Sequence, residues 1–218
     1  MEEKWVCGCS MARWFLRLVF SLFCLTLQNS VTADETVFIE INTSHGDMTL
    51  QLYPEAAPVT VANFLKYVDG KHFDNKATFY RTVRMDNQAQ NNIKIEVIQG
   101  GLELESNNQH FAPILHETTQ ATGILHKDGV ISMARLEPGS ASSEFFICVN
   151  DQPALDFGGK RNPDGQGFAA FGRVIDGMDV VRTIQAMDTD MPEGETLEYT
   201  SGQMLSEPVV MHKVSRRD

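Results

Sequence analysis

The chain has 218 residues, of which 42% are hydrophobic and 22% are charged, a composition that is typical of a folded globular protein and excludes a disordered one. The formal net charge is -11. Nucleic acid is therefore excluded as a partner, because its binding needs an excess of Lys and Arg to displace counterions.

The N-terminus carries the pattern of an export signal. Residues Leu18–Leu27 form an uncharged apolar run, two arginines precede it, and Val31–Ala33 follows with small residues at the cleavage positions. This pattern predicts a signal peptide over residues 1–33, and hence an exported protein, periplasmic or secreted, with no membrane attachment after cleavage. The run is short for a membrane-spanning helix, which needs ~20 apolar residues. An uncleaved, tilted anchor remains an alternative, and Met11 is an alternative start.

The cysteines predict neither a disulfide nor a reactive thiol in the mature chain. After loss of residues 1–33 only Cys148 remains, so no internal disulfide is possible. Cys148 lies in the apolar run Phe145–Val149. We expect a buried packing thiol, because a nucleophilic cysteine needs a cationic and partly exposed setting.

The mature chain begins with a hairpin and a helix and continues with short strands. Residues 37–42 and 48–53 alternate apolar and polar side chains around turn residues, which predicts two paired strands. Pro58 opens a helical pattern that Gly70 ends, and a second helix is predicted over 177–187. Further strands are predicted at 78–83, 95–99, 130–134, 144–149, 168–174 and 208–214. Many short strands with two helices favour a closed antiparallel barrel over a doubly wound α/β fold.

Several segments, in this order, resemble the cyclophilin family. They are Pro58–Leu65, Phe79–Arg81, Val97–Gly101, Gly129–Arg135, Ser143–Cys148, Leu155–Asp156 and Phe168–Val174. The resemblance implies one cyclophilin-like domain over residues 34–218. It also implies a mainly β fold, a closed eight-stranded antiparallel barrel capped by two α-helices. The activity that it implies is peptidyl-prolyl cis–trans isomerisation.

The same resemblance assigns the site. An X–Pro amide resists rotation by ~18–20 kcal/mol, and catalysis needs its twisted form to bind more tightly than either planar form. Arg81 matches the family's catalytic arginine, which donates to the proline nitrogen of the twisted amide, and Gln99 matches the glutamine beside it. Phe146, Met133 and Leu155 match positions that line the proline slot. The other substrate-binding positions are Ala134, Glu144, Glu96 and Phe168.

Two carboxylates depart from the family pattern. Glu96 stands where a phenylalanine is usual, and Glu144 where a glutamine is usual. Near Arg81 they would either pair with the guanidinium and lower activity, or select basic or polar residues beside the proline. The alternative is that the insertion within Thr82–Ile98, whose polar middle at 85–92 we expect to be an exposed loop, turns Glu96 away.

Two aromatic positions also differ. Ala154 replaces a usual tryptophan, so weak binding of cyclosporin-type ligands is expected, and Phe168 replaces a usual histidine. The acidic, polar tail from Thr189 to Ser206 is expected to cover a sheet edge.

The expected partners are proline-containing peptides and unfolded exported proteins, bound by a monomer, and a bacterial periplasm fits the exported form. An alternative function is a proline-segment binding module or chaperone with weak or no turnover. Hydrolytic or metal chemistry is a third possibility, but the sequence has neither a His-x-x-x-His pair nor a Gly-x-Ser-x-Gly elbow. No cofactor and no metal are expected.

Overall fold

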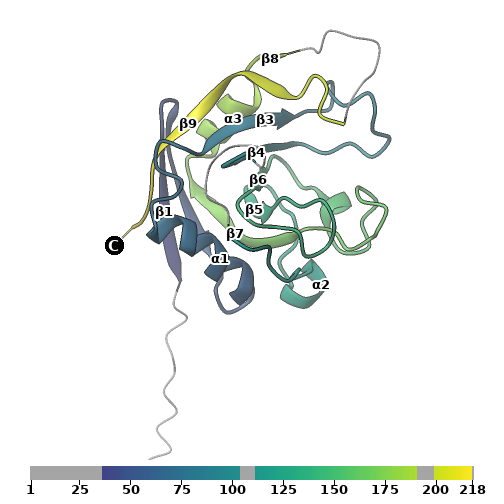
Figure 1. Cartoon of the computed structure of the whole chain (residues 1–218). Helices are drawn as coiled ribbons and strands as arrows, with labels where there is room; N and C mark the ends of the chain where they lie inside the picture. The colour runs from purple at the N-terminus through teal and green to yellow at the C-terminus, as the bar shows by residue number, and fades with distance from the viewer. Residues whose placement is uncertain (1–35, 104–110, 191–198, 218) are drawn as a thin grey trace, which may run out of the picture. The chain divides into compact units, whose positions relative to one another are not determined.

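The computed structural model describes residues 36–103, 111–190 and 199–217 (Figure 1). The predicted signal peptide over residues 1–33 lies outside them. The strands are β1 (Val37–Thr43), β2 (Gly46–Leu52), β3 (Thr78–Val83), β4 (Val97–Gly101), β5 (Val130–Met133), β6 (Phe145–Cys148), β7 (Ala169–Asp176), β8 (Thr189–Asp190) and β9 (Met204–Arg216). The helices are α1 (Pro58–Asp69), α2 (Thr119–Thr122) and α3 (Met178–Gln185), with a 3₁₀ turn at Pro153–Leu155.

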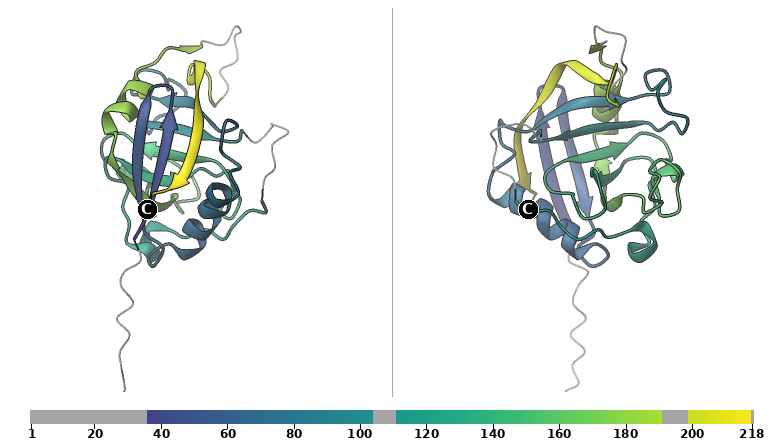
Figure 2. Two further views of the ribbon diagram at one scale, coloured as in Figure 1. Left: turned by 90° about the vertical axis from the view of Figure 1, so that its left-hand side faces the viewer. Right: turned by 45° about the vertical axis from the view of Figure 1, so that its right-hand side comes forward.

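The strands of the described residues close into a barrel. Their order is β1-β2-β7-β5-β6-β4-β3-β9-β8, and β1 also pairs with β9, so eight strands form a ring while β8 adds two residues beside β9. Figure 2 shows β1 and β2 beside the long β9 that completes the ring. Every pairing is antiparallel. The predicted closed eight-stranded antiparallel barrel is therefore confirmed.

Helices α1 and α3 lie at opposite ends of the barrel, as the two predicted helices (Figures 1 and 2). Pro58 is the first residue of α1, where its missing N–H is not needed. Phe64 of α1 packs its ring against three other phenylalanine rings at centroid distances of 5.3 to 5.5 Å, which buries the helix against the core. None of the described helices is long and apolar enough to cross a lipid bilayer.

The third helix, α2, was not predicted. It has four residues, too few for an apolar repeat to show in the sequence. Thr118 caps it by accepting a hydrogen bond from the backbone N–H of Ala121, and Gly123 ends it at a φ of 74°. Such a short helix depends on its cap and on its tertiary neighbours.

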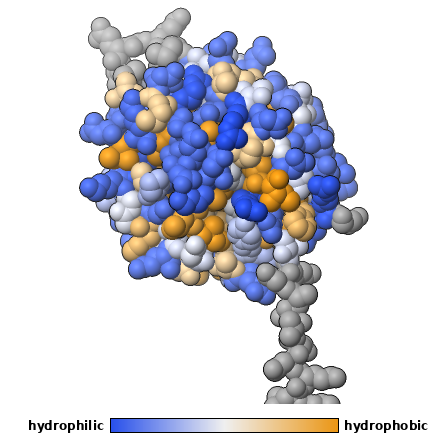
Figure 3. All heavy atoms as spheres, turned by 180° about the vertical axis from the view of Figure 1, so that it is seen from behind, coloured by the Kyte–Doolittle hydropathy of each residue, from blue (hydrophilic) through white to orange (hydrophobic). Residues whose placement is uncertain are grey.

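Two apolar clusters divide the buried side chains. The larger fills the barrel interior and includes Phe145 and Met133, which are paired across β5 and β6. The smaller cluster lies outside this core and contains Phe146, the next residue of β6. This division follows from the pleat, because neighbouring strand residues point to opposite faces of the sheet. On the surface seen in Figure 3, hydrophobic side chains are interspersed among hydrophilic ones.

Candidate active site

Arg81 lies on β3 with its guanidinium held by two glutamines. Its Nη1 donates to Gln99 Oε1 at 2.8 Å, and its Nε and Nη2 donate to Gln203 Oε1 at 3.0 and 2.5 Å. Only 8% of the residue is exposed, and burial lowers the pKa of the guanidinium. Arginine nevertheless stays charged in proteins. The structure therefore presents a nearly buried cation whose direct hydrogen-bond acceptors are neutral amides.

A bulge in β3 decides which way Arg81 points. Phe79 fills the barrel interior, and by strict alternation Arg81 would face the same way. The register of β3 against both neighbouring strands shifts between Phe79 and Arg81. The extra residue, Tyr80, reverses the alternation, so that Arg81 leaves the interior.

The amide of Gln99 is oriented at both ends. Its Oε1 accepts from Arg81, and its Nε2 donates to the Tyr80 hydroxyl at 2.7 Å. That hydroxyl in turn donates to Glu144 Oε2 at 2.5 Å. Burial, followed by the negative charge of Glu144, raises the pKa of Tyr80 far above its ordinary value, so the phenol remains a donor. The hydrogen bonds from Glu144 through Tyr80 thus hold the amide of Gln99 so that its Oε1, and not its Nε2, points toward Arg81.

Glu144 is buried, with 3% of its surface exposed, and also accepts a hydrogen bond from the Ser143 hydroxyl at 2.9 Å. Gly101 makes room for it, because a Cβ there would lie 2.5 Å from Glu144 Oε1, and the φ of Gly101 is +147°. The predicted proximity of Glu144 to Arg81 is realised through Tyr80 and Gln99. The carboxylate anchors the polar chain.

Glu96 is turned away from Arg81, which is the alternative that the sequence left open. It precedes β4, is partly exposed, and accepts a hydrogen bond from Asn150 Nδ2 at 2.9 Å. Its backbone carbonyl accepts from Val149 N. Glu96 is thus engaged at the end of β6 and belongs to none of the hydrogen bonds that hold Arg81.

An apolar cluster adjoins the two polar residues across neighbouring strands. Gln99 is the cross-strand partner of both Arg81 on β3 and Phe146 on β6. Phe146 packs edge-on against Phe168, with ring centroids 5.3 Å apart, and shares its cluster with Leu155. The other buried members are Val83, Ile95, Val97 and Cys148, with Ala134 and Ala154 at the edge. Polar and apolar parts of the predicted site therefore share one outer face.

Met133 is the predicted slot residue that the structure places elsewhere. It is 1% exposed and packs in the barrel interior, apart from the Phe146 cluster. Ala134, the residue after β5, takes the outer position, because successive residues of an extended segment face opposite sides. The structure thus brings Ala134 to the cluster and leaves Met133 as a core residue.

Behind Phe146 lies a row of polar groups, of which His126 and Ser132 are buried and Asp156 is partly exposed. His126 stacks on the Phe146 ring at 5.9 Å, bonds Asp156 Oδ1 through Nδ1 at 2.7 Å and Ser132 Oγ through Nε2 at 2.9 Å. Burial alone would raise the pKa of Asp156, but hydrogen bonds from His126 outweigh it and lower the pKa. His126 and Ser132 are 1% and 0% exposed, so the hydroxyl and the imidazole have no access to a substrate, and the row supports Phe146 instead.

The insertion after Arg81 forms a loop over residues 85–92, as predicted, and most of it is exposed or partly exposed, but Gln88 is not. Gln88 is fully buried, donates to the carbonyls of Arg84 and Ile95, and accepts from Ile95 N. These bonds replace ladder hydrogen bonds at Ile95, which explains why β4 starts at Val97 and not at residue 95. The polar composition of the insertion reflects internal hydrogen bonding as well as contact with water.

Gln203 and Tyr199 are contacts of Arg81 that the sequence reasoning missed. Gln203 is 122 positions from Arg81 in the chain, and its segment was interpreted as an edge cover. Part of that tail, residues 191–198, lies outside the described residues. Tyr199 places its ring 5.1 Å from the Arg81 guanidinium carbon. No local pattern marks either residue, since their role depends on the folding of β9 beside β3.

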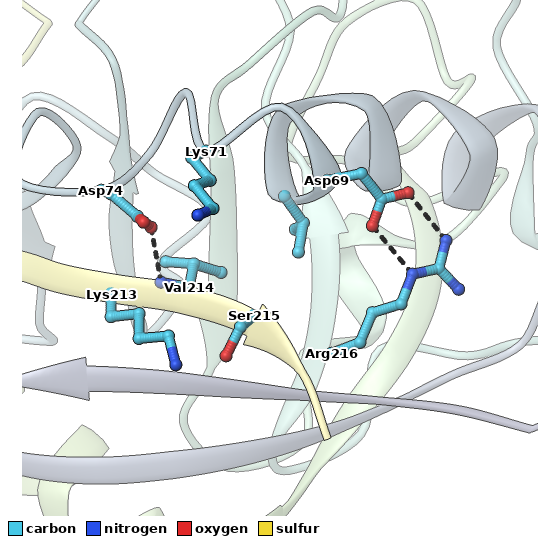
Figure 4. A pocket seen from close by; sticks show the side chains of 8 residues that line it. Asp69, Lys71, Asp74, Lys213, Val214, Ser215 and Arg216 are labelled. Atoms are coloured by element: carbon cyan, nitrogen blue, oxygen red, sulfur yellow. Dashed lines mark hydrogen bonds and ion pairs between the residues drawn. The ribbon is translucent and has the colours of Figure 1, made fainter. Parts of the chain in front are cut away.

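Two hollows are lined by other parts of the chain. The first, of about 200 Å³, lies between the end of α1 and β9 and is crossed by the Asp69–Arg216 ion pair at 2.8 Å (Figure 4). The second, of about 240 Å³, is lined by Thr36 and by residues 51–53, 55 and 56. Neither includes a predicted site residue. Among the residues that the structure describes, no group of three or more His, Cys, Asp or Glu side chains is placed to hold a metal ion.

Comparison with known proteins identifies the family. The model of the cyclophilin type peptidyl-prolyl cis-trans isomerase family matches residues 38–214. The chain is 37% identical over 159 residues to peptidyl-prolyl cis-trans isomerase cyp18 of Streptomyces antibioticus, covering 72% of this chain and 87% of that protein. It is 32% identical over 154 residues to peptidyl-prolyl cis-trans isomerase B of Escherichia coli, covering 69% and 85%.

The fold has matches among solved structures. A cyclophilin type peptidyl-prolyl cis-trans isomerase of Cryptosporidium parvum superposes with a TM-score of 0.59 at 18% identity, covering 84% of this chain and 98% of that one. The same protein in the presence of the dipeptide Ala-Pro gives a TM-score of 0.58, also at 18% identity, covering 83% and 99%. The barrel, the ordered segments and the family match agree, and this chain belongs to the cyclophilin-type peptidyl-prolyl cis–trans isomerase family.

Proposed function

We propose that this protein catalyses cis–trans isomerisation of X–Pro bonds with Arg81 as the hydrogen-bond donor to the proline nitrogen. The observation that carries the proposal is a buried guanidinium, held by the neutral amides of Gln99 and Gln203, next to the apolar cluster around Phe146. Family membership and the names of the curated relatives support the activity.

The hydrogen-bond inventory of Arg81 leaves donors for a substrate. A guanidinium has five N–H groups. Three of them bond the two glutamines, so one on each Nη atom is not used by either amide. Because both acceptors are neutral, they orient the fork without neutralising its charge. Arg81 thus retains its full charge and has N–H donors beyond those that the two amides use.

The chemistry follows from the electronic structure of the amide. As the X–Pro bond twists, nitrogen stops sharing its lone pair with the carbonyl and becomes a hydrogen-bond acceptor. A donor fixed near that nitrogen stabilises the twisted state and neither planar form, which lowers the barrier. The donor is effective because it is already oriented and because apolar neighbours lower the local dielectric constant. No covalent intermediate is needed.

The proline ring binds, in this proposal, against the apolar cluster that contains Phe146, Leu155 and Phe168. Ala134 at its edge contacts the residue before the proline, and its own N–H donates to the Glu144 carbonyl at 2.9 Å. The Cryptosporidium parvum relative of the same fold was solved in the presence of Ala-Pro, which supports a proline-containing ligand. Gln99 orients Arg81 and contacts the substrate backbone.

The clients that we propose are proline-containing segments of unfolded exported proteins, bound by a monomer. This part of the proposal rests on the signal-like pattern over residues 1–33 and the single domain over residues 34–218. A periplasmic or secreted location follows from the same pattern. An exported folding catalyst would act on chains as they emerge, when X–Pro isomerisation limits folding over tens of seconds.

The test is a protease-coupled prolyl peptide assay on the wild type, Arg81→Ala and Arg81→Lys. We expect the alanine variant to lose on the order of 100-fold in kcat/KM, since a fixed transition-state donor is typically worth that much. Lysine is expected to restore little, because it lacks the planar fork. A folded alanine variant with wild-type turnover would refute the role of Arg81.

The binding-module alternative is decided by the same assay. It was motivated by Glu96 and Glu144, but Glu96 bonds Asn150, and Glu144 bonds Tyr80 and Ser143. If wild type and Arg81→Ala both lack turnover while a proline-containing peptide still binds, the protein is a binding module.

A further inference from the structure

We propose that the segment Tyr199–Gln203 is part of the isomerase site, with Gln203 as the positioning residue that aligns Arg81. This inference rests on the proposed function of Arg81. It goes beyond that function because it assigns a role to a distant segment next to the last strand, and links the insertion after β3 to catalysis.

Hydrogen bonds fix both the side chain and the backbone of Gln203. It is fully buried, and its single Oε1 accepts from both Nε and Nη2 of Arg81. Its Nε2 donates to the Asn87 carbonyl at 3.2 Å, so an amide flip would lose all three bonds. Its backbone carbonyl accepts from the N–H of Thr82, the residue after Arg81, at 2.9 Å. Both the backbone and the side chain of Gln203 are therefore held against β3.

Tyr199 completes the enclosure on the face of the guanidinium. Its ring lies 5.1 Å from the Arg81 guanidinium carbon and 5.6 Å from that of Arg161, within the range of cation–π attraction. Arg161 is itself fixed, since it donates to Gln88 Oε1 at 3.1 Å. The backbone carbonyl of Tyr199 accepts from Gln90 Nε2 at 2.9 Å. The insertion thus supports the segment at several points.

The geometry explains why one glutamine is not enough. Gln99 bonds Nη1 alone, and a fork held at one edge can rotate about the long arginine side chain. Gln203 holds the opposite edge through Nε and Nη2. The two together fix the plane of the guanidinium and the direction of the N–H groups that neither amide uses. This alignment acts on the transition state, so its loss should lower kcat and leave KM nearly unchanged.

The first test replaces Gln203 by leucine, which keeps the approximate volume and removes the acceptor. We expect kcat to fall roughly 10- to 100-fold with KM within about twofold, because misplacing a catalytic group by about 1 Å can cost on the order of 100-fold. The control is Asn63→Leu, which removes an equally buried amide on α1 whose partner is the Ser142 carbonyl. The control should lose stability and keep kcat.

A spectroscopic readout separates alignment from folding. In ¹H–¹⁵N spectra the Arg81 Nε–H signal, assigned with Arg81→Lys, should be slow to exchange in the wild type and broadened or lost in Gln203→Leu. Gln203→Glu keeps the acceptor, so it should keep the signal, while its carboxylate neutralises the cation and still lowers kcat. In the Arg81→Lys background, Gln203→Leu should change kcat less than twofold, because no fork is left to align.

The outcomes distinguish this inference from the proposed function. Activity that survives Arg81→Ala would overturn the role of Arg81 and this inference with it. If Arg81→Ala abolishes turnover while folded Gln203→Leu keeps the wild-type kcat, only the positioning role is overturned. The positioning role is also overturned if Gln203→Leu lowers kcat by the same factor in the wild type and in the Arg81→Lys background.

Discussion

Replacing Tyr80 by phenylalanine would remove a single hydroxyl from the centre of the polar chain that ends at Arg81. That hydroxyl accepts from Gln99 Nε2 at 2.7 Å and donates to Glu144 Oε2 at 2.5 Å. The variant keeps the ring and creates almost no cavity. Two losses follow from it: a buried carboxylate loses a donor, and the amide of Gln99 loses the partner that sets its orientation.

The magnitude can be worked from these two bonds. A hydrogen bond to a charged group contributes about 1.5–3 kcal/mol to the free energy of unfolding, so we expect Tyr80→Phe to cost about 2 kcal/mol. For a domain of this size, 1 kcal/mol shifts Tm by about 2–4 °C, which gives a fall of about 4–8 °C. Gln99 can then turn its Nε2 toward Arg81. We expect kcat/KM to fall about tenfold, a smaller loss than removal of the arginine, because Gln203 still holds the fork.

The assay has a thermal arm and a kinetic arm. Thermal unfolding of the wild type, Tyr80→Phe, Glu144→Gln and the double variant gives a cycle, and the coupling between the two residues should be at least about 1 kcal/mol. The prolyl peptide assay gives kcat/KM. If Tyr80→Phe keeps a Tm within 1 °C of wild type and an unchanged kcat/KM, the hydrogen bonds from Glu144 through Tyr80 do not orient Gln99, and the reasoning is refuted.

Three further predictions test other parts of the structure. Glu96→Gln should change kcat/KM less than twofold in the peptide assay, because Glu96 bonds Asn150 and not Arg81; a larger change would return Glu96 to the site. The pKa of Asp156 is lowered in the folded state, so the ionised carboxylate stabilises the fold at pH values above its unfolded pKa of about 3.9. This stabilisation is lost as the pH falls through the lower folded pKa. Thermal unfolding between pH 5 and pH 3 should therefore show a smaller decline for Asp156→Asn than for wild type, and equal slopes would contradict the shift. Both tryptophans, at positions 5 and 14, precede residue 34, so the purified exported form should emit as tyrosine only, and tryptophan emission would argue against cleavage.

The strand pattern and the ordered segments were enough to predict the barrel. Alternation in 37–42 and 48–53 set the first hairpin, and Pro58 and Gly70 delimited α1. The closure of the ring by β9 came from the resemblance, because pairing between β1 and residues 211–216 spans almost the whole domain. The short β8 and α2 carry too few residues for any period to show.

The site was predictable where its residues lie within one segment and unpredictable where it depends on long-range contacts. Arg81, Gln99 and Phe146 could be named because each sits in a recognisable strand. Met133 was misplaced because a one-residue difference along β5 changes the face on which a side chain lies. The function of Gln203 could not be foreseen, since nothing near it in the chain differs from a polar tail.

The sequence by itself determined that the chain would fold as a barrel with an arginine, a glutamine and an outer aromatic residue on adjacent strands. Periodicity, turn residues and segment order are local properties, and they survive without coordinates. Only the tertiary structure decided that a bulge at Tyr80 turns Arg81 outward, that Glu144 anchors the amide of Gln99, and that Gln203 holds the guanidinium from 122 positions away. Hydrogen bonds of this kind depend on distances between atoms of different strands, which the order of residues does not specify.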